Sequence, residues 1–144
     1  MISIRTSLAA LFFSGLAGGA LAGPQYVDGS GYALSGHDPV AYFELKDGAA
    51  PVPGRADLTA EWNGATFAFA TEAHRASFLA DPARYAPQYD GHCAFGVAAG
   101  YKAPADPRRW TVVDGKLYVN YNADVLKMWR KDIPGQLEKS EAVW

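Results

Sequence analysis

The sequence predicts an α+β fold: one small domain in which two β-hairpins are interleaved with short helices, with helices at the C-terminus. Asn-Gly at residues 63–64 and Asp-Gly at residues 114–115 are dipeptides that favour two-residue hairpin turns, and apolar residues alternate on both sides of each. Each hairpin is followed by a segment with a helix-capping residue and apolar residues at helical spacing. Hairpins interleaved with helices are typical of an α+β domain.

The first 22 residues have the three parts of a secretory signal peptide. Arg5 is their only charged residue, an apolar stretch covers residues 8–16, and an A-x-A cleavage site ends at Ala22. The apolar stretch is shorter than the roughly 20 residues that span a bilayer, so a retained anchor is the weaker alternative. The sequence therefore predicts removal of residues 1–22. The mature domain of residues 23–144 would then be periplasmic or secreted, without a membrane span.

The composition of the mature chain limits its partners and its covalent links. Removing Arg5 from the 13 basic residues leaves 12 against 15 acidic ones, a net charge of −3. This mixed and mildly acidic balance argues against a nucleic-acid surface. Cys93 is the only cysteine, so no disulfide forms within one chain. A monomer, a weak dimer and a dimer linked through Cys93 all stay open.

The first hairpin is expected to place its apolar side chains on one face. The residues predicted to pair across the turn on that face are Trp62 with Ala65, Ala60 with Phe67, and Leu58 with Phe69. A surface loop rich in Gly, Pro and Ala precedes this hairpin at residues 44–57. After it, Thr71 is the predicted N-cap of a helix that runs through Leu79. Asp81-Pro82 then ends this helix and begins another turn.

The second hairpin and the C-terminus follow the same pattern. The residues that share the apolar face of this hairpin are Trp110, Val112, Leu117 and Val119, which leaves Thr111 and Tyr118 on the other face. Asn122 or Asp124 begins the next helix. Ile133-Pro134 breaks that helix, and a last helix brings to one side Leu137, Ser140 or Glu141, and Trp144.

Cys93 lies in a run of small residues, 90–98, that predicts a buried helical turn. It is either a small buried hydrophobic residue or a thiolate metal ligand. Sulfur with imidazole nitrogen selects Cu(I) or zinc, and we favour Cu(I) because it accepts as few as two or three ligands. His92 is adjacent, but neighbours on a helix diverge by about 100°, so His74 or His37 is the easier partner. The candidate metal ligands are therefore Cys93, His92, His74 and His37.

Recognisable motifs for catalysis are missing from the sequence, so we predict that the protein is not an enzyme; a Cys-dependent enzyme, with Cys93 as nucleophile and a histidine as base, is the weaker alternative. A phosphate-binding G-x-x-x-x-G-K loop and an H-E-x-x-H zinc motif are both absent. The alternative to metal binding is a metal-free module that holds a periplasmic partner protein or a small apolar ligand in an exposed aromatic groove. The tyrosines that motivate this alternative are Tyr42, Tyr89, Tyr101 and Tyr121.

Four stretches of the chain resemble the YHS domain family, and above all its secreted bacterial members. They are residues 36–43, residues 62–71 with His74, Phe78, Asp81-Pro82 and Tyr85 after them, residues 87–97, and residues 110–120. The likeness covers about residues 30–144, with a core module at about 30–90 and a C-terminal hairpin with helices at 91–144.

This resemblance implies metal binding, because related short domains occur in heavy-metal-transporting ATPases and use cysteine ligands. Those cysteine positions fall on Ala41, Ala70 and His74 here, so only His74 can still bind a metal. A site centred on Cys93 would be a different one. The leading prediction is an exported YHS-type protein that binds a soft transition metal, copper above all, through Cys93 and one or more of the three histidines.

Overall fold

The computed structural model describes residues 21–144, which form two antiparallel hairpins surrounded by short helices and so confirm the predicted α+β class. The elements in chain order are η1 (Ala33–Gly36), η2 (Ala41–Glu44), β1 (Arg55–Trp62), β2 (Ala65–Phe69), α1 (Glu72–Ala80), α2 (Pro82–Tyr85), η3 (Tyr89–Gly91), α3 (Ala94–Ala98), β3 (Asp106–Val113), β4 (Lys116–Asn120), α4 (Ala123–Arg130) and α5 (Ile133–Val143). Within this range no helix is long and apolar enough to cross a membrane. The predicted signal peptide lies outside the described residues except for Leu21 and Ala22.

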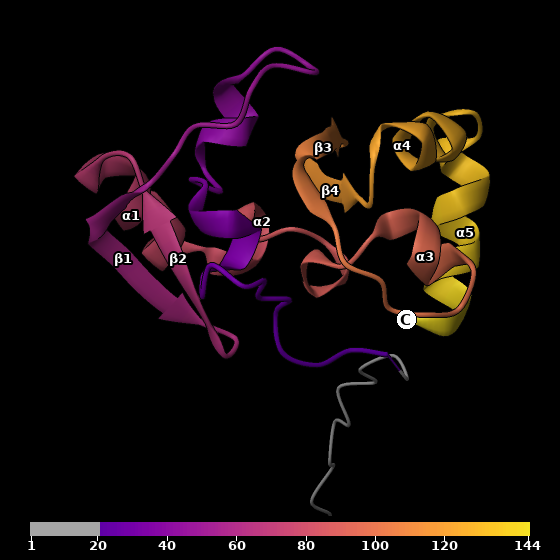
Figure 1. Cartoon of the computed structure of the whole chain (residues 1–144), viewed down its shortest axis with the longest axis horizontal. Helices are drawn as coiled ribbons and strands as arrows, with labels where there is room; N and C mark the ends of the chain where they lie inside the picture. The colour runs from indigo at the N-terminus through magenta and orange to yellow at the C-terminus, as the bar shows by residue number, and fades with distance from the viewer. Residues whose placement is uncertain (1–20) are drawn as a thin grey trace, which may run out of the picture.

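The two hairpins lie in different parts of the molecule. Figure 1 shows β1, β2 and α1 at one end of the long axis and α3, α4 and α5 at the other, with the segment of η1 and η2 between the hairpins. The strands form two separate two-stranded sheets, β1–β2 and β3–β4. The protein therefore has no continuous sheet within residues 21–144, and side-chain packing joins its two ends.

The first hairpin confirms the predicted turn and corrects part of the predicted register. Residues 63 and 64 have φ angles of 48° and 74°, as a type I′ turn requires. The two apolar pairs nearest this turn are those predicted. The predicted pairing of Leu58 with Phe69 is wrong, because the register shifts before Thr59 and Phe69 pairs with Arg55 instead. Extra residues on β1 form this irregularity. It lies at the end of the strand away from the turn, so the residues of the turn do not determine the pairing there.

The second hairpin is buried on both of its faces. Its turn is again as predicted, with φ angles of 50° at residue 114 and 72° at residue 115. Trp110, Leu117 and Val119 face the main core, which they share with the aromatic side chains of β2 and α1. On the opposite face, Tyr118 packs on Trp129 of α4 with ring centroids 5.3 Å apart. The prediction separated these two faces correctly, and the structure adds a second core over Tyr118.

Side-chain caps fix the starts of three helices. The Thr71 hydroxyl accepts a hydrogen bond from the His74 amide at 3.1 Å, which confirms the predicted cap of α1. Asn122 accepts from the Val125 amide at 2.8 Å, so Asn122, and not Asp124, begins α4. Asp132 caps α5, which starts at Ile133-Pro134 directly after α4. The predicted break between the two C-terminal helices is therefore correct.

The loop before β1 is mostly exposed, as predicted, but it is shorter and more firmly held than a free surface loop. It ends before Arg55, where β1 begins. The Asp38 amide donates to the Val52 carbonyl at 2.8 Å. The Trp110 indole donates to the Ala49 carbonyl at 2.9 Å. These two bonds tie the loop to the core on both sides.

Candidate functional site

The four predicted metal ligands do not form one cluster. Within residues 21–144, no group of three or more His, Cys, Asp or Glu side chains is arranged to hold a metal ion. His37 directs Nδ1 to the Leu34 carbonyl oxygen at 2.8 Å. The ring of half-buried His92 lies 5.5 Å from the ring of Tyr26, centroid to centroid. Burial, followed by the positive charge of Lys102, lowers the pKa of His92 below 6.5.

Cys93 is buried, with 2% of its surface exposed, and directly precedes α3. Its thiol donates to Oδ1 of Asn120 at a sulfur–oxygen distance of 3.5 Å. The same oxygen accepts from the Phe95 amide at 3.0 Å. Free cysteine commonly occupies such a position as a small hydrophobic residue with a weak donor. Metal binding through Cys93 therefore stays a prediction without a set of converging ligands.

An apolar groove, here called the aromatic groove, opens above Cys93. It has a volume of about 260 Å³ and is lined by Cys93, Phe95, Tyr101, Ala103, Tyr121 and Val125. Tyr101 and Tyr121 are each 53% exposed. Two exposed aromatic side chains that line one apolar groove are candidates for ligand contact, since exposed apolar patches mark binding grooves whereas isolated exposed residues do not. The other two tyrosines of the aromatic prediction lie elsewhere: Tyr42 is 1% exposed in the main core, and Tyr89 packs on Tyr118 and Trp144.

Local backbone contacts build the walls of the aromatic groove. The Tyr101 amide donates to the Gly96 carbonyl at 3.1 Å, and the Cys93 amide donates to the Ala103 carbonyl at 3.0 Å, so residues 101–103 are held across α3. A Cβ atom at Gly96 would lie 3.2 Å from the Tyr101 ring and 3.3 Å from the Ala103 methyl group. Glycine at this position therefore allows the loop to approach the helix this closely.

The chemistry of the aromatic groove suits an apolar group of modest size. Its described lining holds no charged side chain, and its polar atoms are the tyrosine hydroxyls and the Cys93 thiol. A closed apolar cavity of about 150 Å³ accepts one benzene ring, whereas drug-sized ligands occupy about 300–1,000 Å³. A volume of about 260 Å³ thus matches one ring with a short substituent.

A second site, which is polar, surrounds the fully buried carboxylate of Asp38. The groups that donate to this carboxylate are the amides of Val40 at 2.9 Å, Ala41 at 3.2 Å and Ala70 at 2.9 Å, and Nδ1 of His74 at 2.6 Å. The carboxylate therefore joins η2, the end of β2 and α1. Buried carboxylates are stable only when their oxygens are satisfied in this way.

His74 stands between two carboxylates. Its Nε2 lies 3.1 Å from Oε1 of Glu44, an exposed residue at the end of η2. Partial burial alone would lower the pKa of His74, but the hydrogen bond and charge of Asp38, followed by those of Glu44, outweigh burial and raise it above 6.5. The imidazolium form consequently bridges a buried acid and a surface acid. Arg84 and Tyr85 line the surface pocket beside it, which has a volume of about 410 Å³.

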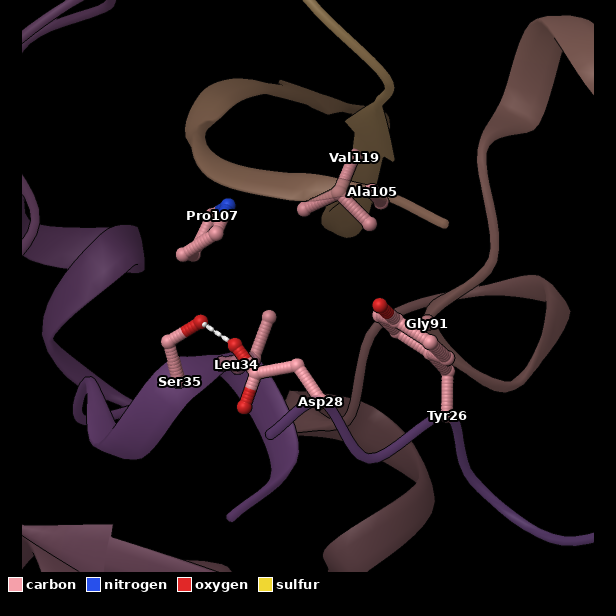
Figure 2. Close-up of a pocket in the computed structure, with 8 residues that line it drawn as sticks. All are labelled: Tyr26, Asp28, Leu34, Ser35, Gly91, Ala105, Pro107 and Val119. Atoms are coloured by element: carbon pink, nitrogen blue, oxygen red, sulfur yellow. Dashed lines mark hydrogen bonds between the residues drawn. The ribbon is translucent and has the colours of Figure 1, made fainter. Parts of the chain in front are cut away.

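A third cavity, at the junction of the two ends, is too small for a ligand. It measures about 10 Å³, near the volume that one water molecule needs, and lies between the N-terminal segment, η1, the turn at Gly91 and the second hairpin (Figure 2). The Asp28 carboxylate accepts hydrogen bonds from the hydroxyls of Ser30 and Ser35 there. Partial burial of Asp28 raises its pKa, but these hydroxyls outweigh burial and lower the pKa below 3.8.

Several residues of the aromatic groove were predicted from the sequence to be functional, but not as members of one site. Cys93 was assigned to metal binding and Tyr101 with Tyr121 to the alternative, while Phe95, Ala103 and Val125 were not singled out. The contact between Asp38 and His74 was not predicted from the sequence either. The available signal was the segment of residues 36–43, which contains Asp38 and is one of the stretches that resemble the YHS domain. No protein-family model matches the chain, and no curated protein or solved structure matches it either. The likeness to the YHS domain accordingly stays an expectation.

Proposed function

We propose that this protein is an exported, metal-free binding module of YHS type that holds a small apolar ligand in the aromatic groove. The observation that carries the proposal is the pair Tyr101 and Tyr121, which are both 53% exposed and both line one apolar recess of about 260 Å³. Aromatic side chains in such a recess gain contact area and ring–ring attraction when a flat apolar group packs on them. The ligand class is a single aromatic ring or an equally small aliphatic group.

Titration with indole, followed by amide chemical shifts of the isotopically labelled protein, tests this function. We expect saturable shifts confined to residues 93–103 and 121–125. Tyr121→Ala and Tyr101→Ala should each weaken binding by roughly tenfold, because each removes an aromatic side chain that lines the groove. Leu79→Ala is the matched control, since Leu79 is also 50% exposed but lies on α1. Shifts spread over the surface, or equal affinity in the tyrosine variants and the control, would reject the proposal.

Binding of a zinc ion at His74 is a second candidate, and one observation favours it. Asp38 accepts from Nδ1 of His74 and leaves Nε2 beside Glu44, which is the carboxylate–histidine arrangement that orients metal ligands in many proteins. Imidazole with carboxylate suits zinc, whereas a thiolate such as that of Cys93 suits Cu(I). These two residues supply fewer protein ligands than the three of an ordinary catalytic zinc site.

Competition titrations with Zn²⁺ and with Cu(I) distinguish the metal candidates from the metal-free module. Zinc affinity that falls in His74→Ala and not in Cys93→Ala would support the His74 site. Cu(I) affinity that falls only in Cys93→Ala would restore the copper prediction. Absence of tight binding for both ions would leave the aromatic groove as the functional site.

A further inference from the structure

We propose that the carboxylate of Asp90 is the docking site for the new α-amino group of Gly23, which is created when the chain is cleaved after Ala22. The inference rests on the predicted cleavage and is independent of the proposed ligand. It assigns a function to the polar cluster of Gly23, Gln25, Asn63 and Asp90, which belongs neither to the aromatic groove nor to the Asp38 site. Processing of the precursor would thereby add an ion pair that the unprocessed chain lacks.

The geometry for this pair is already present. The backbone nitrogen of Gly23 donates to Oδ2 of Asp90 at 2.8 Å. Ala22, directly before it, is exposed, and Gly23 is partly buried. In the unprocessed chain this nitrogen belongs to an amide with one N–H bond and no charge. Once the amine is free, the same atom carries three N–H bonds and a positive charge at the same short distance.

The surrounding contacts hold both partners in place. The side-chain amide of Asn63 donates to the Gly23 carbonyl at 3.1 Å and to Oδ1 of Asp90 at 3.1 Å. Nε2 of Gln25 donates to the same Oδ1 at 3.3 Å. The Tyr26 amide donates to the Asp90 carbonyl at 2.7 Å. The amine therefore meets a carboxylate that polar groups from two other parts of the chain have already positioned.

The strap formed by residues 23–26 also explains why this position affects the whole domain. On one side it binds the turn of the first hairpin, where the Gln25 amide donates to the Asn63 carbonyl at 3.0 Å. On the other side it binds the turn that contains Asp90, through the hydrogen bond from the Tyr26 amide to the Asp90 carbonyl. An ion pair at Gly23 would therefore tighten a connection between the two ends of the molecule.

Cleavage is hydrolysis of one peptide bond. Water, brought in by a peptidase of the export machinery, adds across the Ala22–Gly23 peptide bond. The carbonyl carbon of Ala22 takes the hydroxyl group and leaves as a carboxylate, while the Gly23 nitrogen takes protons and becomes an ammonium. No oxidant or reductant takes part.

Two charged groups lie beside the Gly23 nitrogen, and a third titratable group is coupled to both of them. Asp90 attracts it, while Lys102 opposes it, since Nζ of Lys102 would lie 3.3 Å from a Cβ atom at Gly23. Lys102 also lies over the Trp144 ring, 5.9 Å from its centroid. His92 is the third group, close enough to feel the charges of both Lys102 and Asp90, and burial followed by the charge of Lys102 lowers its pKa. The Asp90 carboxylate is in direct hydrogen-bond contact with this nitrogen of Gly23 at 2.8 Å, so we expect it to raise the α-amino pKa above its ordinary value.

The first test determines the N-terminus of the protein recovered after export of the full chain. Mass spectrometry should find Gly23 as the first residue. A protein that begins at any other residue would overturn the proposal.

The second test is a double-mutant cycle on the processed protein. One protein has the free Gly23 amine, its partner has the same amine acetylated, and each is made with and without Asp90→Asn. At pH 6 the free amine should raise the folded-to-unfolded ratio roughly 3- to 10-fold when Asp90 is present and not in the D90N background. At pH 10 this coupling should vanish, because the amine is neutral. Equal effects in the two backgrounds would overturn the proposal.

A direct titration decides the question even where D90N does not fold. Reductive methylation with a ¹³C label keeps the amine titratable and reports its pKa in the folded protein and in urea. A folded-state value above the value in urea supports the ion pair, and an equal or lower value refutes it.

Discussion

Replacing Asp38 should destabilise the fold more than any comparable change of a surface acid. Asp38→Ala removes a fully buried carboxylate and leaves three amide N–H groups and Nδ1 of His74, all buried or partly buried, without their acceptor. A buried donor left unpaired costs about 1–3 kcal/mol, and removing one partner of a buried charged pair costs about 3–5 kcal/mol. Since these costs overlap, we expect a total loss of about 4 kcal/mol. That is a large part of the roughly 5–15 kcal/mol that stabilises an ordinary domain.

Asp38→Asn gives an intermediate and informative case. The amide keeps the oxygen that accepts from Val40 and Ala41, but it puts an NH₂ group against the Ala70 amide. His74 can change tautomer and accept at Nδ1, so only one backbone donor is left unpaired. We expect a loss of about 2 kcal/mol, between that of the alanine variant and the wild type.

Urea denaturation followed by tryptophan fluorescence measures these losses as changes in the free energy of unfolding at constant m-value. Asp57→Asn is the matched control, because Asp57 forms a surface pair with Arg55 in which both side chains are more than 60% exposed. Its effect should stay within about 0.5 kcal/mol. If Asp38→Ala costs less than about 1 kcal/mol with an unchanged m-value, Asp38 does not hold η2, β2 and α1 together, and the reasoning is refuted.

Three further predictions concern single contacts. His74→Gln should cost most below pH 6.5, and the wild-type advantage should fade as the pH rises through the raised pKa of His74, because only the imidazolium carries a charge and donates from both ring nitrogens, to Asp38 and to Glu44. Urea titrations across pH 5–9 measure this advantage, and a pH-independent difference contradicts the prediction. Gly96→Ala should displace Tyr101 and weaken indole binding several-fold, as chemical-shift titration would show, whereas unchanged affinity means that the loop adapts without cost. Asn122→Ala should lower the free energy of unfolding by about 1 kcal/mol through loss of the α4 cap, and a loss below 0.3 kcal/mol would show that the cap is replaced by water.

Much of the candidate site could not be predicted from the sequence, because its residues are far apart in the chain. Cys93, directly before α3, and Val125 of α4 line one groove. The exposed state of Tyr101 and the buried state of Tyr42 cannot be told from the residue type. Asp38 and His74 are 36 residues apart, and their pairing depends on how η2 packs on α1. Each of these relations is a product of packing and not of a local pattern.

The sequence by itself determined the features that depend on a few neighbouring residues. Both turns formed where Asn-Gly and Asp-Gly tolerate positive φ, and Thr71 caps its helix because its hydroxyl reaches an amide three residues ahead. Only the tertiary structure decided the register change in β1, the second core over Tyr118 and the convergence of the groove. The physical reason is range: turn and cap energies arise within four residues, whereas burial and long-range hydrogen bonds depend on which surfaces meet once the whole chain has folded.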